Sequence, residues 1–144
     1  MKKLVLEMPL VWAVMNLGLR VVNLQSVAPG LGPMKLRASR CSLGAFEDWM
    51  QWMDGAALDE WRGTGDDVAA GALRRFASGH GYDLRRMWQT MDRQMAGVEI
   101  RVMLVECMPP EVVCASAWRR PGFYGWVFEK HEMPVVTSPQ GSGR

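Results

Sequence analysis

The pattern of apolar positions predicts a strand followed by a helix at the start of the chain. Residues 4–6 form a short apolar run that is typical of a strand. Pro9 then opens a second apolar segment, residues 10–17, and Gly18 follows it. Proline suits the first turn of a helix because its missing N–H has no partner there, and glycine often follows the last helical residue. We therefore expect this helix to end at Gly18.

Two more strands are predicted before residue 41. Residues 19–24 are rich in valine, and residues 34–38 alternate apolar and basic side chains, as a half-buried strand does. A Pro/Gly loop, residues 28–33, separates them. Residues 21–24 should pair with another strand of the same sheet.

Residues 42–96 have a helical pattern. Ser42 is a plausible N-cap, and apolar residues recur after it at helical spacing. The expected helices run from Ser42 through Met53, as a separate short segment over 56–61, over 68–78 after Asp66 and Asp67, and over 84–95 after Asp83. We expect Trp49 and Trp88 to be largely buried, because stripes of Trp and Met at this spacing are more often core than ligand site.

The C-terminal third is predicted to return to strands. Residues 98–107 and 124–128 have β-branched and aromatic character, and residues 133–136 are expected to form a last strand. The small polar tail, residues 138–144, should be loosely ordered. The chain is short enough for one domain. It would consist of a barrel half over 3–40, a helical insertion over 42–96 and a barrel half over 98–137.

This order of elements resembles the ASCH domain, a small β-barrel family related to PUA RNA-binding domains. Family members often begin with a strand, then Q-P-W-A-W, a helix, G-K-D-I-E-N-R and R-G-P-L-L-I-H-A-S-K. The positions that match this pattern here are Pro9, Trp12, Ala13, Gly18, Asn23, Gly32, Pro33, Ala38 and Ser39. Gly122, Tyr124 and Gly125 resemble the family's G-P-Y-G-F-V-L. The resemblance implies an α+β fold, a PUA-like barrel with a helical insertion between its halves.

The polar residues of the family motif are largely replaced. The motif lysine falls on Leu19, or on Arg20 after a shift of one residue, and the motif glutamate falls on Val22 or Asn23. Some small family members hydrolyse acetylated cytidine with that lysine, a threonine and a glutamate. An amidohydrolase is therefore only an alternative for this chain, and we name no catalytic residue.

Composition restricts the remaining function classes. The net charge is only +2, so a polyanion partner must be argued from local clusters of basic residues. The three cysteines, Cys41, Cys107 and Cys114, lack metal-ligand spacing, and a reduced cytoplasmic protein is the simplest interpretation. His80 and His131 lie far apart in the sequence, so we expect no metal and no other cofactor. No apolar segment is long enough to predict a membrane span.

Binding of nucleic acid, in particular RNA, is the function that the sequence favours. Trp118, Arg119, Arg120 and Tyr124 combine cations for phosphates with rings for base stacking in one short run. The Pro-Gly turn that follows Arg120 predicts that both arginines are exposed. Further candidates on or beside the N-terminal strands are Arg20, Asn23, Lys35, Arg37 and Arg40.

A protein-interaction module is the second candidate class. The chain contains 12 methionines and 7 tryptophans, which would suit an exposed apolar patch. Loss of the polar cavity residues from a retained scaffold is also what a repurposed domain would show. The small size resembles phage-encoded ASCH proteins, which suggests a module that modulates a host protein. The sequence leaves the oligomeric state open.

Overall fold

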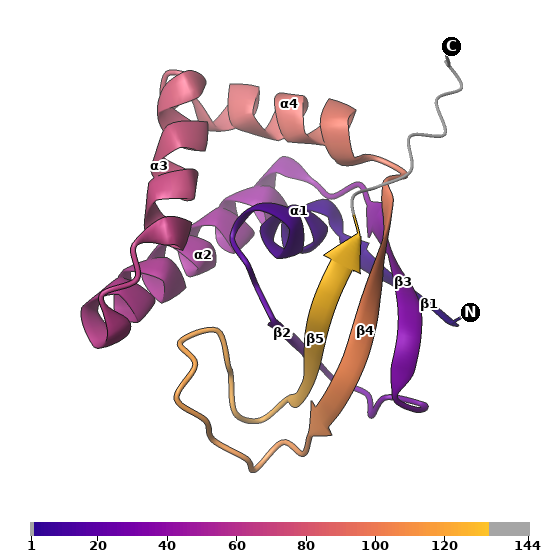
Figure 1. The fold of residues 1–144 in the computed structure, drawn as a ribbon. Helices are drawn as coiled ribbons and strands as arrows, with labels where there is room; N and C mark the ends of the chain where they lie inside the picture. Colours follow the sequence, from indigo (N-terminus) through magenta and orange to yellow (C-terminus); the bar gives the residue numbers. More distant parts are fainter. Residues whose placement is uncertain (1, 133–144) are drawn as a thin grey trace.

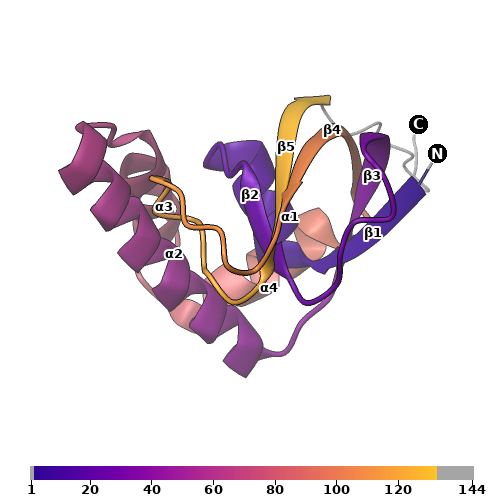
Figure 2. The same cartoon turned by 90° about the horizontal axis from the view of Figure 1, so that it is seen from below.

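One curled sheet holds every strand of residues 2–132, the part of the chain that this computed structural model describes. The elements follow in the order β1 (Lys2–Glu7), α1 (Met8–Asn16), β2 (Val21–Leu24), β3 (Gly32–Ser39), α2 (Leu43–Thr64), α3 (Val68–Gly79), α4 (Leu84–Met95), β4 (Glu99–Met108) and β5 (Tyr124–Glu132). The class is α+β, as predicted, and the five strands form a half-barrel around α1 (Figures 1 and 2).

The strands are arranged in the order β1-β3-β4-β5-β2. β1 and β3 are parallel, and the other neighbours are antiparallel. The two predicted barrel halves are thus interleaved, because β3 pairs with β4 and β2 pairs with β5. The expected pairing of residues 21–24 is confirmed, with Val21 opposite Val127 and Leu24 opposite Tyr124.

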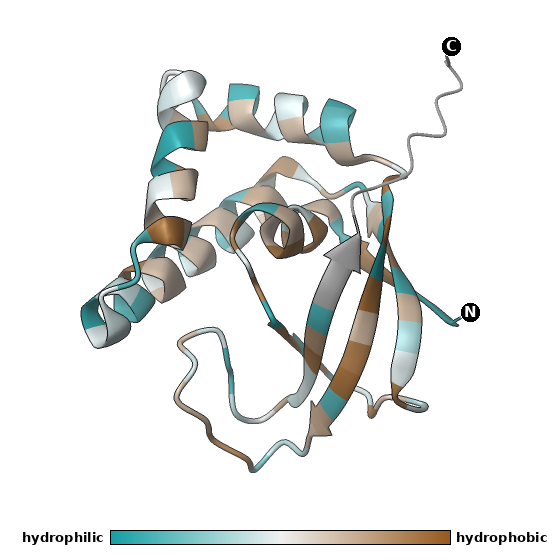
Figure 3. Ribbon diagram, in the orientation of Figure 1, coloured by the Kyte–Doolittle hydropathy of each residue, from teal (hydrophilic) through white to brown (hydrophobic). Residues whose placement is uncertain are grey.

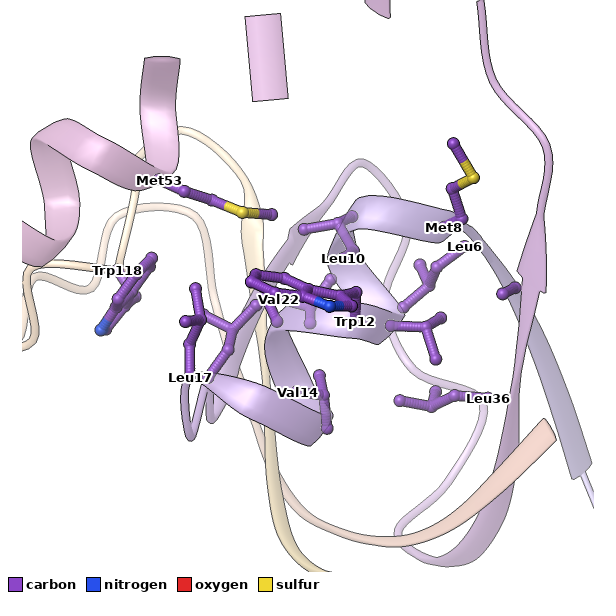
Figure 4. Close-up of a cluster of buried hydrophobic side chains, with 14 of the residues drawn as sticks. Leu6, Met8, Leu10, Trp12, Val14, Leu17, Val22, Leu36, Met53 and Trp118 are labelled. Carbon is purple, nitrogen blue, oxygen red and sulfur yellow. The ribbon is translucent and has the colours of Figure 1, made fainter. Parts of the chain in front are cut away.

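Helix α1 fills the hollow of the sheet. Pro9 lies in its first turn, and the chain turns away at Gly18, where φ is +68°. Seven of its residues are buried, so the helix is apolar nearly all round and must be enclosed by protein. Figure 4 shows Trp12 among side chains from the sheet, from α2 and from the loop that carries Trp118.

Helices α2, α3 and α4 cover the side of α1 that the sheet leaves open (Figure 1). Ser42 caps α2 by accepting a hydrogen bond from the backbone N–H of Ala45, and Asp83 caps α4 in the same way through Arg86. The expected break before residue 56 is wrong, since α2 is one 22-residue helix. Gly55 lowers helix propensity without ending a helix whose Met50, Met53, Ala56 and Ala57 are buried on one side.

The two tryptophans predicted to be largely buried are only half-buried. Each places its ring against the core and uses its indole N–H at the boundary. Trp49 Nε1 donates to Glu7 Oε1 at 2.9 Å, and Trp88 Nε1 donates to the Cys41 carbonyl at 2.9 Å. The need for a polar partner explains why neither ring is fully covered.

The strand expected over residues 133–136 and the tail after residue 137 lie outside the described residues. β5 continues to Glu132, four residues beyond the predicted end at residue 128. Within residues 2–132, no helix is both long enough and apolar enough to cross a bilayer.

Candidate functional site

The structure distributes the sequence-predicted site residues over four places. Asn23, Trp118, Arg119, Arg120 and Tyr124 come together where β2 meets β5 and the loop between β4 and β5. Lys35 and Arg37 lie on the outer face of β3, Arg20 lies beside a pocket before β2, and Arg40 lies next to α4. They therefore do not form one continuous surface.

Asn23 and Arg119 form a structural lock between β2 and the loop. Asn23 Nδ2 donates to the Trp118 carbonyl, and Asn23 Oδ1 accepts from Arg119 Nη1 at 3.2 Å and from the Arg120 backbone N–H at 2.9 Å. Arg119 also donates to three loop carbonyls, those of Pro109, Arg120 and Phe123, at 2.7–2.9 Å. One guanidinium thus fixes both ends of the loop.

The expectation that Arg119 is exposed is wrong. Arg119 is only 6% exposed, because loop carbonyls replace the water that would otherwise solvate the guanidinium. Trp118 is also buried, and its ring meets the edge of Trp52 of α2 with ring centres 5.6 Å apart. Figure 2 shows the loop lying along α2. These two residues build the fold and are unavailable to phosphates or bases.

Arg120 alone keeps the features predicted for this loop. It is exposed, and its guanidinium carbon lies 5.3 Å from the centre of the Phe123 ring. One cation on one ring can contact nucleic acid, but the neighbouring Tyr124 is half-buried in the sheet. The loop therefore offers a smaller surface than the sequence suggested.

The cations of β3 belong to a row across the sheet. Lys35 is paired with Lys3 of β1 on one side and Arg101 of β4 on the other, so their side chains share a face. Glu99 lies beside this row, 2.8 Å from Lys3 and 3.7 Å from Arg37. The hydrogen bond from Lys3, with Lys35 and Arg37 nearby, lowers the pKa of Glu99. The carboxylate therefore stays charged and offsets part of the positive charge there.

A pocket of about 210 Å³ lies between the end of α1 and strand β5. Its lining is mostly apolar, with Val14, Leu19, Val102 and Phe128. The two ionisable lining residues, Arg20 and Glu129, pair with each other at 2.9 Å. Among the described lining residues none is a lysine, serine, threonine or cysteine, and the one carboxylate, Glu129, is held in the ion pair with Arg20.

Sequence reasoning missed a group of four arginines on α3 and α4 that make no ion pair within residues 2–132. Arg74 and Arg75 lie just past the middle of α3, and Arg85 and Arg86 lie in the first turn of α4. We call these four residues the arginine corner. All four are exposed, and none is in an ion pair with a described carboxylate. The available signal was the repeated Arg-Arg pair on either side of a Gly-containing turn.

The charges around the corner are segregated. Residues 42–67 contain seven carboxylates and one arginine, whereas residues 68–95 contain five arginines and two aspartates. Both aspartates are engaged, since Asp83 caps α4 and Asp92 pairs with Arg40 at 3.0 Å. The net charge of +2 therefore conceals an acidic α2 and a basic α3–α4 unit. Figure 3 shows hydrophilic residues in the middle of α3 and at both ends of α4.

Among the described residues no group of three or more His, Cys, Asp or Glu side chains could hold a metal ion. The cysteines are free. Burial, with the charges of Glu7 and Asp92, raises the pKa of the Cys41 thiol from 9.0 to about 11.

At pH 8 we expect iodoacetamide to alkylate the exposed Cys114 readily and Cys41 only after unfolding. With a pKa of about 11, only roughly one Cys41 thiol in a thousand is ionised at pH 8. Because the folded state keeps this proton while the unfolded thiol loses it, Cys41 makes stability fall as the pH rises from about 9 to about 11. Peptide mass spectrometry with and without urea measures the labelling. Equal rates at Cys41 and Cys114 in native buffer would contradict this assignment.

We found no match to this chain among family models, curated proteins or solved structures.

Proposed function

We propose that the protein binds nucleic acid without catalysis and that the arginine corner makes the phosphate contacts. The observation that carries this proposal is the concentration of four exposed, unpaired guanidinium groups around one short turn. Along the helix axes, they lie within about 8 Å of the turn. Guanidinium groups suit phosphate because their planar N–H groups can donate two parallel hydrogen bonds.

Helix stability does not explain the position of Arg85 and Arg86. The first turn of a helix favours acidic side chains, because the partial charge at that end is positive. Two arginines there oppose the helix dipole, so a binding role is the better explanation. The acidic α2 would repel a polyanion and so direct it to the α3–α4 side of the molecule.

Replacing Arg85 and Arg86 together by alanine is expected to weaken nucleic-acid binding by at least about tenfold at low salt. The dependence of log affinity on log salt should become shallower by about 1.5, because two fewer counterions are released. Filter-binding titrations at several salt concentrations measure both quantities. Phosphate contacts are common to RNA and DNA, so a single-stranded RNA and a duplex DNA are both used as probes.

The matched control is the double variant Arg62→Ala/Arg120→Ala, which removes two exposed arginines elsewhere. It should bind like the wild type. If the control loses affinity while the Arg85/Arg86 variant does not, the arginine corner is not the binding surface, and the single variants Arg62→Ala and Arg120→Ala then show whether α2 or the β4–β5 loop is. If neither variant changes affinity or salt dependence, the proposed function is wrong.

A divergent ASCH-like, PUA-related barrel is the fold assignment we propose, and RNA is the ligand class that this family favours. Three motif positions support it by their backbone roles: Pro9 opens α1, Gly18 has a φ of +68°, and Gly125 passes directly beneath Arg119. Asn23 supports it too, because it joins β2 to the loop before β5.

Docking of a basic protein is the second candidate function, and the C-terminal end of α2 carries it. Leu58, Trp61 and Val68 are 38%, 42% and 62% exposed, next to Asp59, Asp66 and Asp67. An exposed tryptophan with acidic neighbours is a common anchor for a positively charged partner. Affinity capture with wild-type and Trp61→Ala protein as baits tests this function. Recovery of the same proteins by both baits would argue against it.

A further inference from the structure

We propose that α3, its turn and α4 form a helix-turn-helix unit that places α4 in the major groove of duplex DNA. This inference rests on the proposed nucleic-acid function, and it names duplex DNA as the ligand in place of the RNA that the family resemblance favours. It assigns Arg74, Arg75, Arg85 and Arg86 to the phosphates, and Gln89 and Arg93 to the base edges.

The connection between the helices has the form that such a unit needs. Four residues, 80–83, join α3 to α4, and Gly81 has a φ of +64°. A short turn that contains glycine is typical of helix-turn-helix motifs. In Figure 1, α4 runs across the end of α3 instead of folding back beside it.

Hydrogen bonds fix the turn. The Tyr82 N–H donates to the Ala77 carbonyl at 2.8 Å, and the Asp83 N–H donates to the His80 carbonyl at 3.1 Å. His80 Nδ1 lies 2.7 Å from the Phe76 carbonyl, and the Phe76 ring packs between His80 and Trp12 of α1. These contacts hold the two helices at a constant angle to each other and to the core. The direction in which the exposed face of α4 points is therefore fixed as well.

Tyr82 is the exposed feature of this turn. Its backbone has a φ of 56°, which is unusual for a residue with a side chain, and the residue is 67% exposed. Packing of the ring in the core therefore does not explain why a tyrosine, instead of a glycine, occupies this position. Its hydroxyl can donate to a phosphate beside the arginines.

Helix α4 divides into a packing face and a free face. Met87, Met91 and Met95 recur every four residues and are buried. Trp88 ties the helix to the chain before α2 through its bond to the Cys41 carbonyl. The exposed side chains of α4 are those of Arg85, Arg86, Gln89, Arg93 and Gln94. No apolar side chain is among them, so the free face is built for contact with a polar surface.

The chemistry of this face matches the edges of base pairs. Arginine can donate two hydrogen bonds to guanine, and glutamine can both donate to and accept from adenine in the major groove. A helix of 12 residues is about 18 Å long and fits a groove about 12 Å wide. The major groove of A-form RNA is too narrow for a helix, so duplex RNA would not be read in this way.

The test is selection of preferred sequences from a randomised duplex library by wild type, Gln89→Ala and Gln51→Ala. Gln51 is an exposed glutamine on the acidic α2 and provides the matched control. We expect the wild type and Gln51→Ala to enrich one motif. Gln89→Ala should lose the preference at one position and bind the selected duplex roughly 5- to 150-fold more weakly. Its salt dependence should not change, because glutamine carries no charge.

The outcomes separate this inference from the proposed function. Enrichment of no motif, or of the same motif by Gln89→Ala, would overturn the base-reading role of α4. Tighter binding of single-stranded RNA than of any duplex would also overturn it. In each of these cases the proposed function stands if the Arg85/Arg86 variant still loses affinity. Thermal melts should show that Gln89→Ala folds normally, since exposed substitutions usually change stability by less than about 0.5 kcal/mol.

Discussion

Replacing Arg119 by alanine is expected to lower the free energy of unfolding by about 3 kcal/mol or more. The change removes four hydrogen bonds and leaves the carbonyls of Pro109, Arg120 and Phe123 and the Asn23 side chain without this donor. Arg119→Lys should restore little, because one ammonium group cannot reach acceptors that surround a planar guanidinium. Urea titration followed by tryptophan fluorescence measures the effect.

Arg120→Ala is the control for this experiment. Arg120 is the next residue along the loop, but its side chain is exposed. Within residues 2–132 that side chain makes a cation–π contact with Phe123 and no hydrogen bond. Its loss should cost less than about 0.5 kcal/mol. Equal effects of the two substitutions would show that Arg119 does not act as the lock. A double-mutant cycle with Asn23→Ala should give a coupling energy of about 1 kcal/mol or more between Asn23 and Arg119.

The second large effect is expected for Gly125→Ala, which should destabilise the protein by about 1–3 kcal/mol. A Cβ at this position would lie 2.9 Å from Met108 Cε, 3.1 Å from Arg119 Nε and 3.2 Å from Arg119 Cδ. Arg119 cannot move aside without breaking its bonds to the loop. The same urea titration measures this loss.

Gly55→Ala provides a matched glycine substitution with the opposite sign. Gly55 lies inside α2, and apart from its own chain neighbours and the adjacent helix backbone no atom lies within 4 Å of the position that its Cβ would take. Alanine there should stabilise the protein by about 0.5–1 kcal/mol through helix propensity. If alanine destabilises the protein at both positions, the close approach to Arg119 is not the reason why position 125 requires glycine.

Local patterns in the sequence predicted most of the fold. Pro9, Gly18, Ser42 and Asp83 mark element ends through the chemistry of the nearest few residues, and each end was placed correctly to within a few residues. Gly55 was misleading because tertiary burial of the residues around it outweighs its helix propensity. The propensity of one residue is a small term beside the packing of a helix face.

The candidate site was much less predictable. Arg119 and Arg120 are neighbours with the same side chain, yet one is buried and the other is exposed. What distinguishes them is Asn23, which lies about a hundred residues earlier in the sequence and reaches the loop only because β2 pairs with β5. Likewise, Arg85 and Arg86 have no acidic partner on α4 because Asp83 caps the helix and Asp92 pairs with Arg40. Local spacing carries no information about such long-range partners.

The pairing of β2 with β5 also has a consequence for synthesis on the ribosome. Within the described sheet, β5 is the only neighbour of β2, and it is made about a hundred residues later. Throughout that interval, β1, α1 and β3 can begin to associate, while Val21 and Val22 of β2 have no strand to pair with. The nascent chain therefore carries an unpaired β2 until β5 emerges, and it depends on chaperones or on rapid synthesis of the intervening residues to avoid aggregation. A chain terminated before Tyr124 would leave β2 permanently without the one strand that it pairs with in the described sheet.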